Sequence, residues 1–161
     1  VSLFHFMTSR ADLRLQSEWD DFFEAYVQGQ VPYGDWFDHN LAWWDASQTA
    51  GNILFVKYEE MQKDLAASVE AVAAFIDFPL TPDLRNRVVA QSTFAAMAAN
   101  TKANWNLNPT QNGAADKHLR KGVVGDWQNH FSKVQLDRYD TLYRQAMAGS
   151  GLDFDFERTA A

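Results

Sequence analysis

The sequence predicts an α/β fold that is predominantly helical and contains one clear core strand. Apolar residues recur at the spacing of amphipathic helices through most of the chain. The short apolar run 53–58 instead is rich in β-branched and aromatic residues and follows Gly51-Asn52, which is typical of a buried parallel strand. The length of 161 residues suits one domain, or a large piece of one.

Three helices are expected before the strand. Residues 1–9 resemble the end of a buried helix, and a chain that starts inside it without a cap indicates a truncated start. In the range 17–28, Ser17 is the expected cap, acidic residues fill the first turn, and Gly29 ends the helix. The range 34–46 repeats the apolar pattern.

Four further helices are expected after the strand. They span 62–77, 81–91, 92–99 and 132–147. Thr81-Pro82 predicts the second start, since proline suits the first helical position, and Gly149 closes the last helix. The tail 151–156 alternates like a short strand. Residues 100–117 have no periodicity, and loops of this length are usually lids, binding loops or disordered segments.

Composition excludes several classes of function. The chain has no cysteine and four histidines without metal spacing, so neither disulfides nor a metal site is expected. The net charge of −7, without a broad basic face, argues against nucleic acid and anionic membranes as partners. No apolar run approaches a membrane span and no signal peptide is visible, which favours a cytoplasmic location.

The sequence concentrates two cations beside a glycine at Arg120-Lys121-Gly122. A guanidinium fork and an ammonium point charge both suit phosphate, and Gly122 allows close approach to the backbone. The cluster follows the long polar loop, which favours a small polyanionic ligand. A solvated surface cluster is the alternative.

Two aromatic residues could serve either in ligand binding or in core packing. Tyr58 ends the predicted strand, where open α/β sheets bind ligands, but it also suits a residue that covers the core. Phe94 is explained most simply by core packing. No phosphate loop, dinucleotide-binding glycine motif or nucleophile elbow occurs, so the residues supply an anion site without a complete catalytic constellation.

Several segments together form an ordered series. They are 1–6, 33–39 with Trp43-Trp44, 53–61, 92–97, 120–122 with Gly125-Asp126-Trp127, and 149–154. This series resembles the cytosolic-type sulfotransferases, which use 3′-phosphoadenosine 5′-phosphosulfate as sulfonate donor, and the likeness runs from residue 1 to about 157. It implies a parent α/β fold with a P-loop-like parallel sheet flanked by helices, of which residues 1–161 form the carboxyl-terminal portion of one domain.

The resemblance also implies a role for each matched residue. The cofactor-binding positions are Ser2, Tyr58, Ser92, Thr93, Phe94, Met97, Leu119, Arg120, Lys121 and Gly122. Ser2 and Arg120 would hold the 3′-phosphate, and Phe94 would stack on the adenine. Phe6 and Tyr33 match positions that line the acceptor pocket.

The family's transfer centre has no counterpart in this sequence. Its phosphosulfate loop with a lysine, its catalytic histidine and the arginine that partners the serine all precede the segment at Val1. Sulfonate transfer needs placed cations and a base, so we assign no catalytic residue and expect these 161 residues alone to be inactive.

Three departures from the family pattern are visible. Ser92-Thr93-Phe94 replaces Thr-Ser-Phe, and His118 stands where an aromatic residue often precedes the basic motif. The family's dimer motif is degenerate, so its typical dimer is not predicted. The residues at the positions of that motif are Gln128, Ser132, Lys133 and Asp137.

The leading hypothesis is a sulfotransferase that moves a sulfonate to a hydroxyl or amine of a small acceptor. The alternative is a non-catalytic helical module that binds adenosine 3′-phosphate nucleotides or a protein partner. A helical scaffold with an incidental basic cluster ranks last, because it explains neither the long loop nor the ordered motifs.

Overall fold

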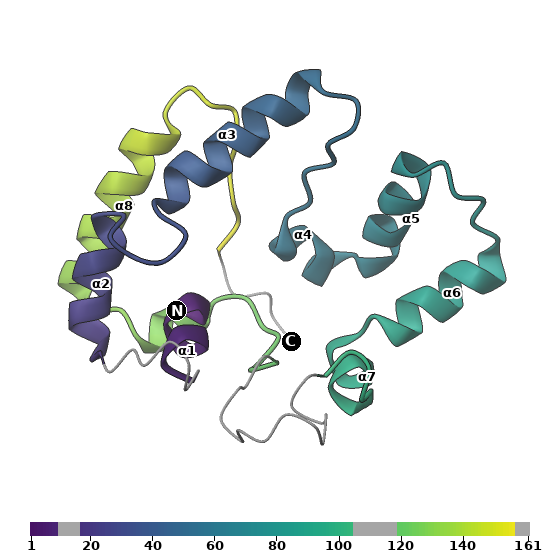
Figure 1. The fold of residues 1–161 in the computed structure, drawn as a ribbon, viewed down its shortest axis with the longest axis horizontal. Coiled ribbons are helices and arrows are strands. Elements are labelled where there is room, and N and C mark those ends of the chain that lie inside the picture. The colour runs from purple at the N-terminus through teal and green to yellow at the C-terminus, as the bar shows by residue number, and fades with distance from the viewer. Residues whose placement is uncertain (10–16, 105–118, 157–161) are drawn as a thin grey trace. The chain divides into compact units, whose positions relative to one another are not determined.

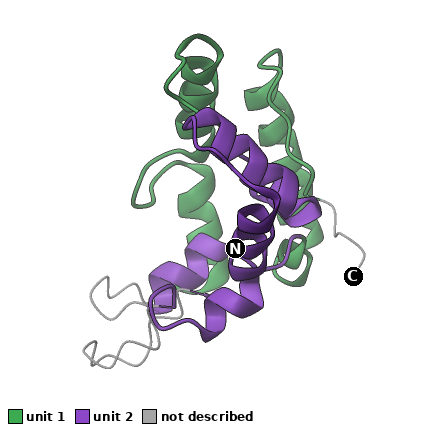
Figure 2. Cartoon of the chain, turned by 90° about the vertical axis from the view of Figure 1, so that its right-hand side faces the viewer, with its two compact units in different colours: residues 1, 16–55, 125–157 green, residues 2–15, 56–124, 158–161 purple. Residues whose placement is uncertain are grey.

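The computed structural model describes residues 1–9, 17–104 and 119–156. Helices dominate these residues, which confirms the predominantly helical prediction (Figure 1). The expectations for most of the long loop and for His118 lie outside the described residues. The described chain divides into two compact units, coloured separately in Figure 2. Their membership in one domain stays a prediction.

The first unit combines two separate stretches of the chain. Its described residues are Val1, 17–55 and 125–156. Its helices are α2 (Trp19–Val27), α3 (Trp36–Thr49), the short 3-10 helix η2 (Asp126–Asn129) and α8 (Lys133–Met147). Its most deeply buried apolar side chains are Phe22, Phe23, Val31, Met147 and Leu152.

Aromatic packing joins α2 to the residues around α8. The ring of Phe23 lies 5.5 Å from that of Phe131, and the Trp19 ring lies 5.2 Å from the same Phe131. The Trp19 indole also donates a hydrogen bond of 3.1 Å to Gln135 on α8. These contacts build the core of the first unit from residues far apart in sequence. Figure 1 shows α2 beside α8.

The start of α2 differs from the sequence expectation. Glu18, not Ser17, occupies the N-cap and makes no capping bond with its side chain. The Ser17 hydroxyl instead donates to the Glu18 carbonyl at 3.1 Å. The end is as predicted: Gly29 adopts φ +67, and its N–H donates to the Tyr26 carbonyl at 3.1 Å.

The second unit contains the remaining helices of the described residues. They are α1 (Ser2–Ser9), α4 (Tyr58–Lys63), α5 (Leu65–Phe75), α6 (Pro82–Gln91) and α7 (Phe94–Ala99). The predicted helix 62–77 is in fact parts of two helices, since Asp64 leaves helical geometry at φ −146, ψ 86 and caps α5 through the Ala67 N–H at 2.9 Å. Thr81 caps α6, as its sequence predicted.

The predicted core strand is not confirmed. Residues 53–57 form no strand, and Tyr58 begins α4 instead. The side chains still alternate as in a strand, since Ile53 and Phe55 are half-buried whereas Leu54 and Val56 are exposed. A strand requires a hydrogen-bonded neighbour, and none exists within residues 1–9, 17–104 and 119–156. The tail 151–156 alternates without strand pairing for the same reason.

Candidate functional site

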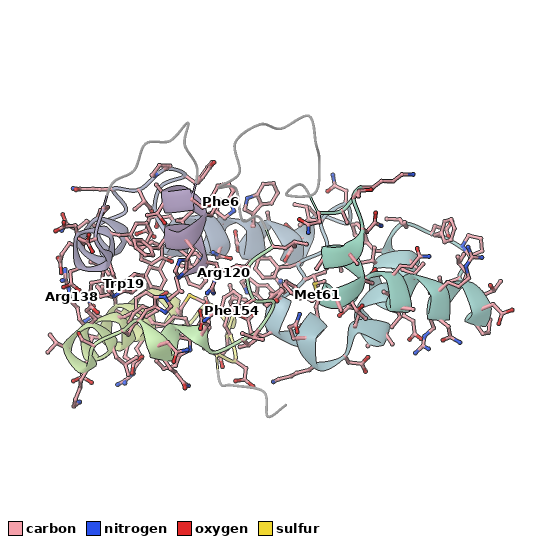
Figure 3. All side chains as sticks on the ribbon, turned by 90° about the horizontal axis from the view of Figure 1, so that it is seen from below. Phe6, Trp19, Met61, Arg120, Arg138 and Phe154 are labelled. Carbon is pink, nitrogen blue, oxygen red and sulfur yellow. The ribbon has the colours of Figure 1, made fainter. Side chains whose placement is uncertain are left out.

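A cavity of about 500 Å³ lies within the second unit. This volume is in the range of small-molecule and cofactor sites. Figure 3 labels three of the residues around it, Phe6, Met61 and Arg120. The complete lining is Ser2, His5, Phe6, Tyr58, Met61, Gln62, Leu65, Ser92, Thr93, Phe94, Met97, Leu119, Arg120, Lys121, Gly122 and Val123.

Helical periodicity explains one side of the cavity. Tyr58 is the first residue of α4, and Met61 and Gln62 follow it at spacings of three and four; Leu65 lines the cavity from the start of α5, after the break at Asp64. Side chains at these spacings share one helix face. On α1, Ser2, His5 and Phe6 lie in the cavity wall at the same three- and four-residue spacings. One face of each helix therefore supplies a set of lining residues.

The junction between α6 and α7 positions the aromatic wall. Ser92 ends α6, and Thr93 caps α7 by accepting a 3.2 Å hydrogen bond from the Ala96 N–H. The Thr93 hydroxyl also donates to the Ala90 carbonyl at 3.2 Å. These bonds fix the backbone at Phe94, the first residue of α7, so that its ring reaches the cavity.

The basic segment approaches that ring closely. Gly122 has φ +65, a left-handed conformation that favours glycine. A Cβ added to Gly122 would lie only 2.1 Å from Cδ2 and 2.5 Å from Cγ of Phe94. The Phe94 ring therefore occupies the space that the side chain of any other residue at position 122 would need.

The lining chemistry suits a flat anion. Arg120 and Lys121 contribute positive charge, and no Asp or Glu occurs among the described residues that line the cavity. Burial, followed by the charge of Glu59, raises the pKa of Tyr58, so its phenol stays neutral at physiological pH and can donate a hydrogen bond. Aromatic rings beside cations can bind a planar group and an anion of the same molecule.

The structure brings all ten predicted cofactor-binding residues together around this one cavity. Phe6, predicted to touch the acceptor, lines the same cavity, whereas Tyr33 does not. Tyr33 lies in the first unit, 80% exposed, in a turn with φ 79. That these residues bind a ligand stays a prediction.

The sequence analysis missed several lining residues. They are His5, Met61, Gln62, Leu65 and Val123. The helical spacing from Tyr58 could have identified Met61 and Gln62 on α4. The strand-like composition of residues 53–58 conceals the start of α4 at Tyr58.

Comparison with known proteins identifies the family of this chain. Residues 1–151 match the family described as "Sulfotransferase domain". Human sulfotransferase 2B1 is 40% identical over 151 residues, which cover 92% of this chain and 41% of the relative. Rat sulfotransferase 1C2 is 34% identical over 159 residues, covering 98% of this chain and 53% of the relative.

Solved structures agree with this match. Mouse sulfotransferase SULT7A1, complexed with PAP, superposes with a TM-score of 0.78 at 32% identity, over 93% of this chain and 55% of that one. Retinol dehydratase, in complex with androsterone and inactive cofactor PAP, has a TM-score of 0.86 at 24% identity, over 95% of this chain and 45% of that one. The latter likeness shows the fold alone.

Paired cations and aromatic rings around one cavity are the kind of chemistry that small-molecule sites use. The chain belongs to the sulfotransferase domain family, as the resemblance implied. It spans about half the length of the relatives it matches.

Proposed function

We propose that this chain forms the nucleotide-binding half of a sulfotransferase that uses 3′-phosphoadenosine 5′-phosphosulfate. The acceptor would be a hydroxyl or amine of a small molecule. The observation that carries the proposal is the cavity that joins Arg120, Lys121 and Gly122 to Phe94 and Tyr58. Family membership and the PAP held by mouse SULT7A1 support the same nucleotide.

The phosphate end of the nucleotide is assigned to the basic segment. Arg120 supplies a guanidinium fork that can form two parallel hydrogen bonds to a phosphate, and Lys121 adds a point charge. Ser2, at the start of α1, lines the same cavity and offers a hydroxyl donor. The absence of lining carboxylates among the described residues keeps repulsion of the anion low.

The adenine end is assigned to the aromatic side of the cavity. Phe94 offers a ring for stacking, and Met97, one helical turn later on α7, adds a polarizable thioether. Tyr58 combines an aromatic face with a neutral hydroxyl. We assign Phe6 and Tyr33 to contacts with the acceptor.

The transfer step needs more than these residues. The bound donor supplies the sulfonate, and the enzyme must stabilise the departing group and accept a proton from the acceptor. We assign neither task to residues 1–161, so we expect this chain to bind the nucleotide without turnover. No helix in the described ranges is long and apolar enough to cross a membrane. The resemblance to cytosolic-type sulfotransferases leads us to propose a cytoplasmic location.

Calorimetric titration of the chain with adenosine 3′,5′-bisphosphate tests the proposal. Arg120→Ala should weaken binding roughly 10- to 100-fold, because a charge-assisted hydrogen bond contributes about 1.5–3 kcal/mol. Arg144→Ala is the matched control. Arg144 lies exposed on α8 of the first unit, 3.6 Å from Asp140, and its removal should leave the affinity unchanged.

Two results would contradict the proposal. The unmodified chain could fail to bind the nucleotide at millimolar concentration, which would leave the cavity without its assigned ligand. Binding could instead survive Arg120→Ala unchanged, which would remove the basic segment from the site.

A further inference from the structure

Gly122 differs from other left-handed glycines of this chain in what surrounds it. An added Cβ would meet nothing within 4 Å at Gly34, Gly149 or Gly151, so their backbone angles alone explain glycine there. At Gly122, three atoms of the Phe94 ring lie 2.1, 2.5 and 2.7 Å from the position of a Cβ. Position 122 therefore requires glycine for a second reason, the space taken by the ring.

We propose that Gly122 is a positioning residue that acts through Phe94. By lacking a side chain, it lets the Phe94 ring rest against the backbone of the basic segment, beside Arg120 and Lys121. The arrangement fixes the distance between the surface that stacks on the base and the cations that bind phosphate. This inference rests on the proposed function, because it assigns base recognition to the ring.

The Phe94 ring has few ways to avoid a new side chain at position 122. The Phe94 backbone is held at the start of α7, where the Met97 N–H donates to the Thr93 carbonyl at 2.9 Å and the Ala96 N–H to the Thr93 hydroxyl at 3.2 Å. Ordinary contact begins near 3.4 Å, so the ring would have to move by roughly 1 Å or more, which favours a different rotamer. A methyl group at Gly122 should therefore displace the stacking surface.

Two ligands separate the ring from the phosphate contacts. One is adenosine 3′,5′-bisphosphate, and the other is its abasic analogue, a tetrahydrofuran bisphosphate with the same two phosphates and no base. Gly122→Ala should weaken the nucleotide about tenfold, the scale of one lost base stack, and the abasic ligand less than about twofold. Arg120→Ala should weaken both ligands.

The backbone strain of an alanine at positive φ needs its own control. Gly149→Ala introduces the same strain, at φ +76, where a Cβ meets nothing within 4 Å. It should leave both affinities unchanged. Circular dichroism melting of each variant then separates a loss of folding from a loss of binding.

A double-variant cycle tests whether Gly122 acts through the ring. Phe94→Ala removes the ring atoms that an alanine at position 122 would strike, so adding Gly122→Ala to Phe94→Ala should change nucleotide affinity less than about twofold. If Gly122→Ala lowers nucleotide affinity by the same factor with and without the Phe94 ring, the inference is wrong. Phe94→Ala should itself keep the affinity for the abasic ligand.

The outcomes distinguish this inference from the proposed function. Equal losses of both ligands in Gly122→Ala would mean that phosphate meets the Gly122 backbone directly, and the role through Phe94 would be wrong while the nucleotide site stands. Unchanged affinity for both ligands would also overturn it. If the unmodified chain binds neither ligand, or if Arg120→Ala has no effect, the proposed function fails and this inference fails with it.

Discussion

Replacement of Gln135 by alanine should strongly destabilise the first unit. The Gln135 side chain is 9% exposed. Its oxygen accepts from the Trp19 indole at 3.1 Å and from the Ser132 N–H at 3.0 Å, and its amide nitrogen donates to Asp20 at 2.8 Å. One side chain thus links α2 to the capping box that begins α8.

The magnitude follows from the groups that lose their partner. Gln135→Ala removes the oxygen that accepts from the half-buried Trp19 indole and from the Ser132 N–H, and each lost bond costs about 1–1.5 kcal/mol. Asp20 is exposed and can exchange its lost bond for water. The expected loss in free energy of unfolding is therefore about 2–3 kcal/mol, or roughly 5–10 °C in Tm for a chain of this size.

Thermal melting followed by circular dichroism and tryptophan fluorescence measures this loss. Gln145→Ala is the matched control, since Gln145 is an exposed glutamine on the same helix. Gln135→Glu adds a second test: it keeps the oxygen acceptors but places a carboxylate beside Asp20, so its destabilisation should shrink as the pH falls to about 4. The Tm values of two variants can be compared to about 2 °C. If the Tm of Gln135→Ala lies within about 2 °C of the Tm of Gln145→Ala, this reasoning is wrong.

Three further predictions concern pH, capping and activity. Burial raises the pKa of Tyr26 to about 12. Burial and the neighbouring Tyr26 also raise the pKa of Tyr139. Because a phenol in the unfolded chain ionises at about pH 10, the free energy of unfolding should fall as the pH rises from about 10 to 12. Urea unfolding at several pH values checks this, and a flat profile would exclude it. Thr93→Ala and Thr81→Ala each remove a helix cap worth about 1 kcal/mol of stability. Only Thr93→Ala should also lower nucleotide affinity, because it loosens the backbone at Phe94. Equal nucleotide affinities of the two variants in calorimetry would argue against this role of the Thr93 cap. In an assay with labelled donor, the 161 residues alone should transfer no sulfonate, and steady transfer would show that the chain holds its own catalytic centre.

Local chemistry made much of the fold predictable from the sequence. Thr81-Pro82 combines a capping hydroxyl with a proline at the first helical position, and α6 begins there. Gly29 and Gly149 end their helices because both adopt positive φ. Each of these signals depends on residues within a few positions of one another.

The sequence predictions that were wrong depend on residues or contacts beyond the local segment. The run 53–58 has the composition of a strand, but strand formation depends on a neighbour that its own sequence does not contain. Asp64 looked compatible with a continuous helix, yet its side chain bonds to the Ala67 N–H and starts a new one. The close contact of Gly122 with Phe94 likewise could not be predicted, because the motif identifies both residues without their distance.

The most direct test of the central claim is the contact between bound nucleotide and protein. Intermolecular nuclear Overhauser effects can be measured between adenosine 3′,5′-bisphosphate and the isotopically labelled chain. The account predicts contacts from the adenine protons to the ring of Phe94 and the side chain of Met97, together with shifted Arg120 side-chain resonances. Adenine contacts elsewhere, with the Phe94 and Arg120 signals unmoved at saturation, would contradict it.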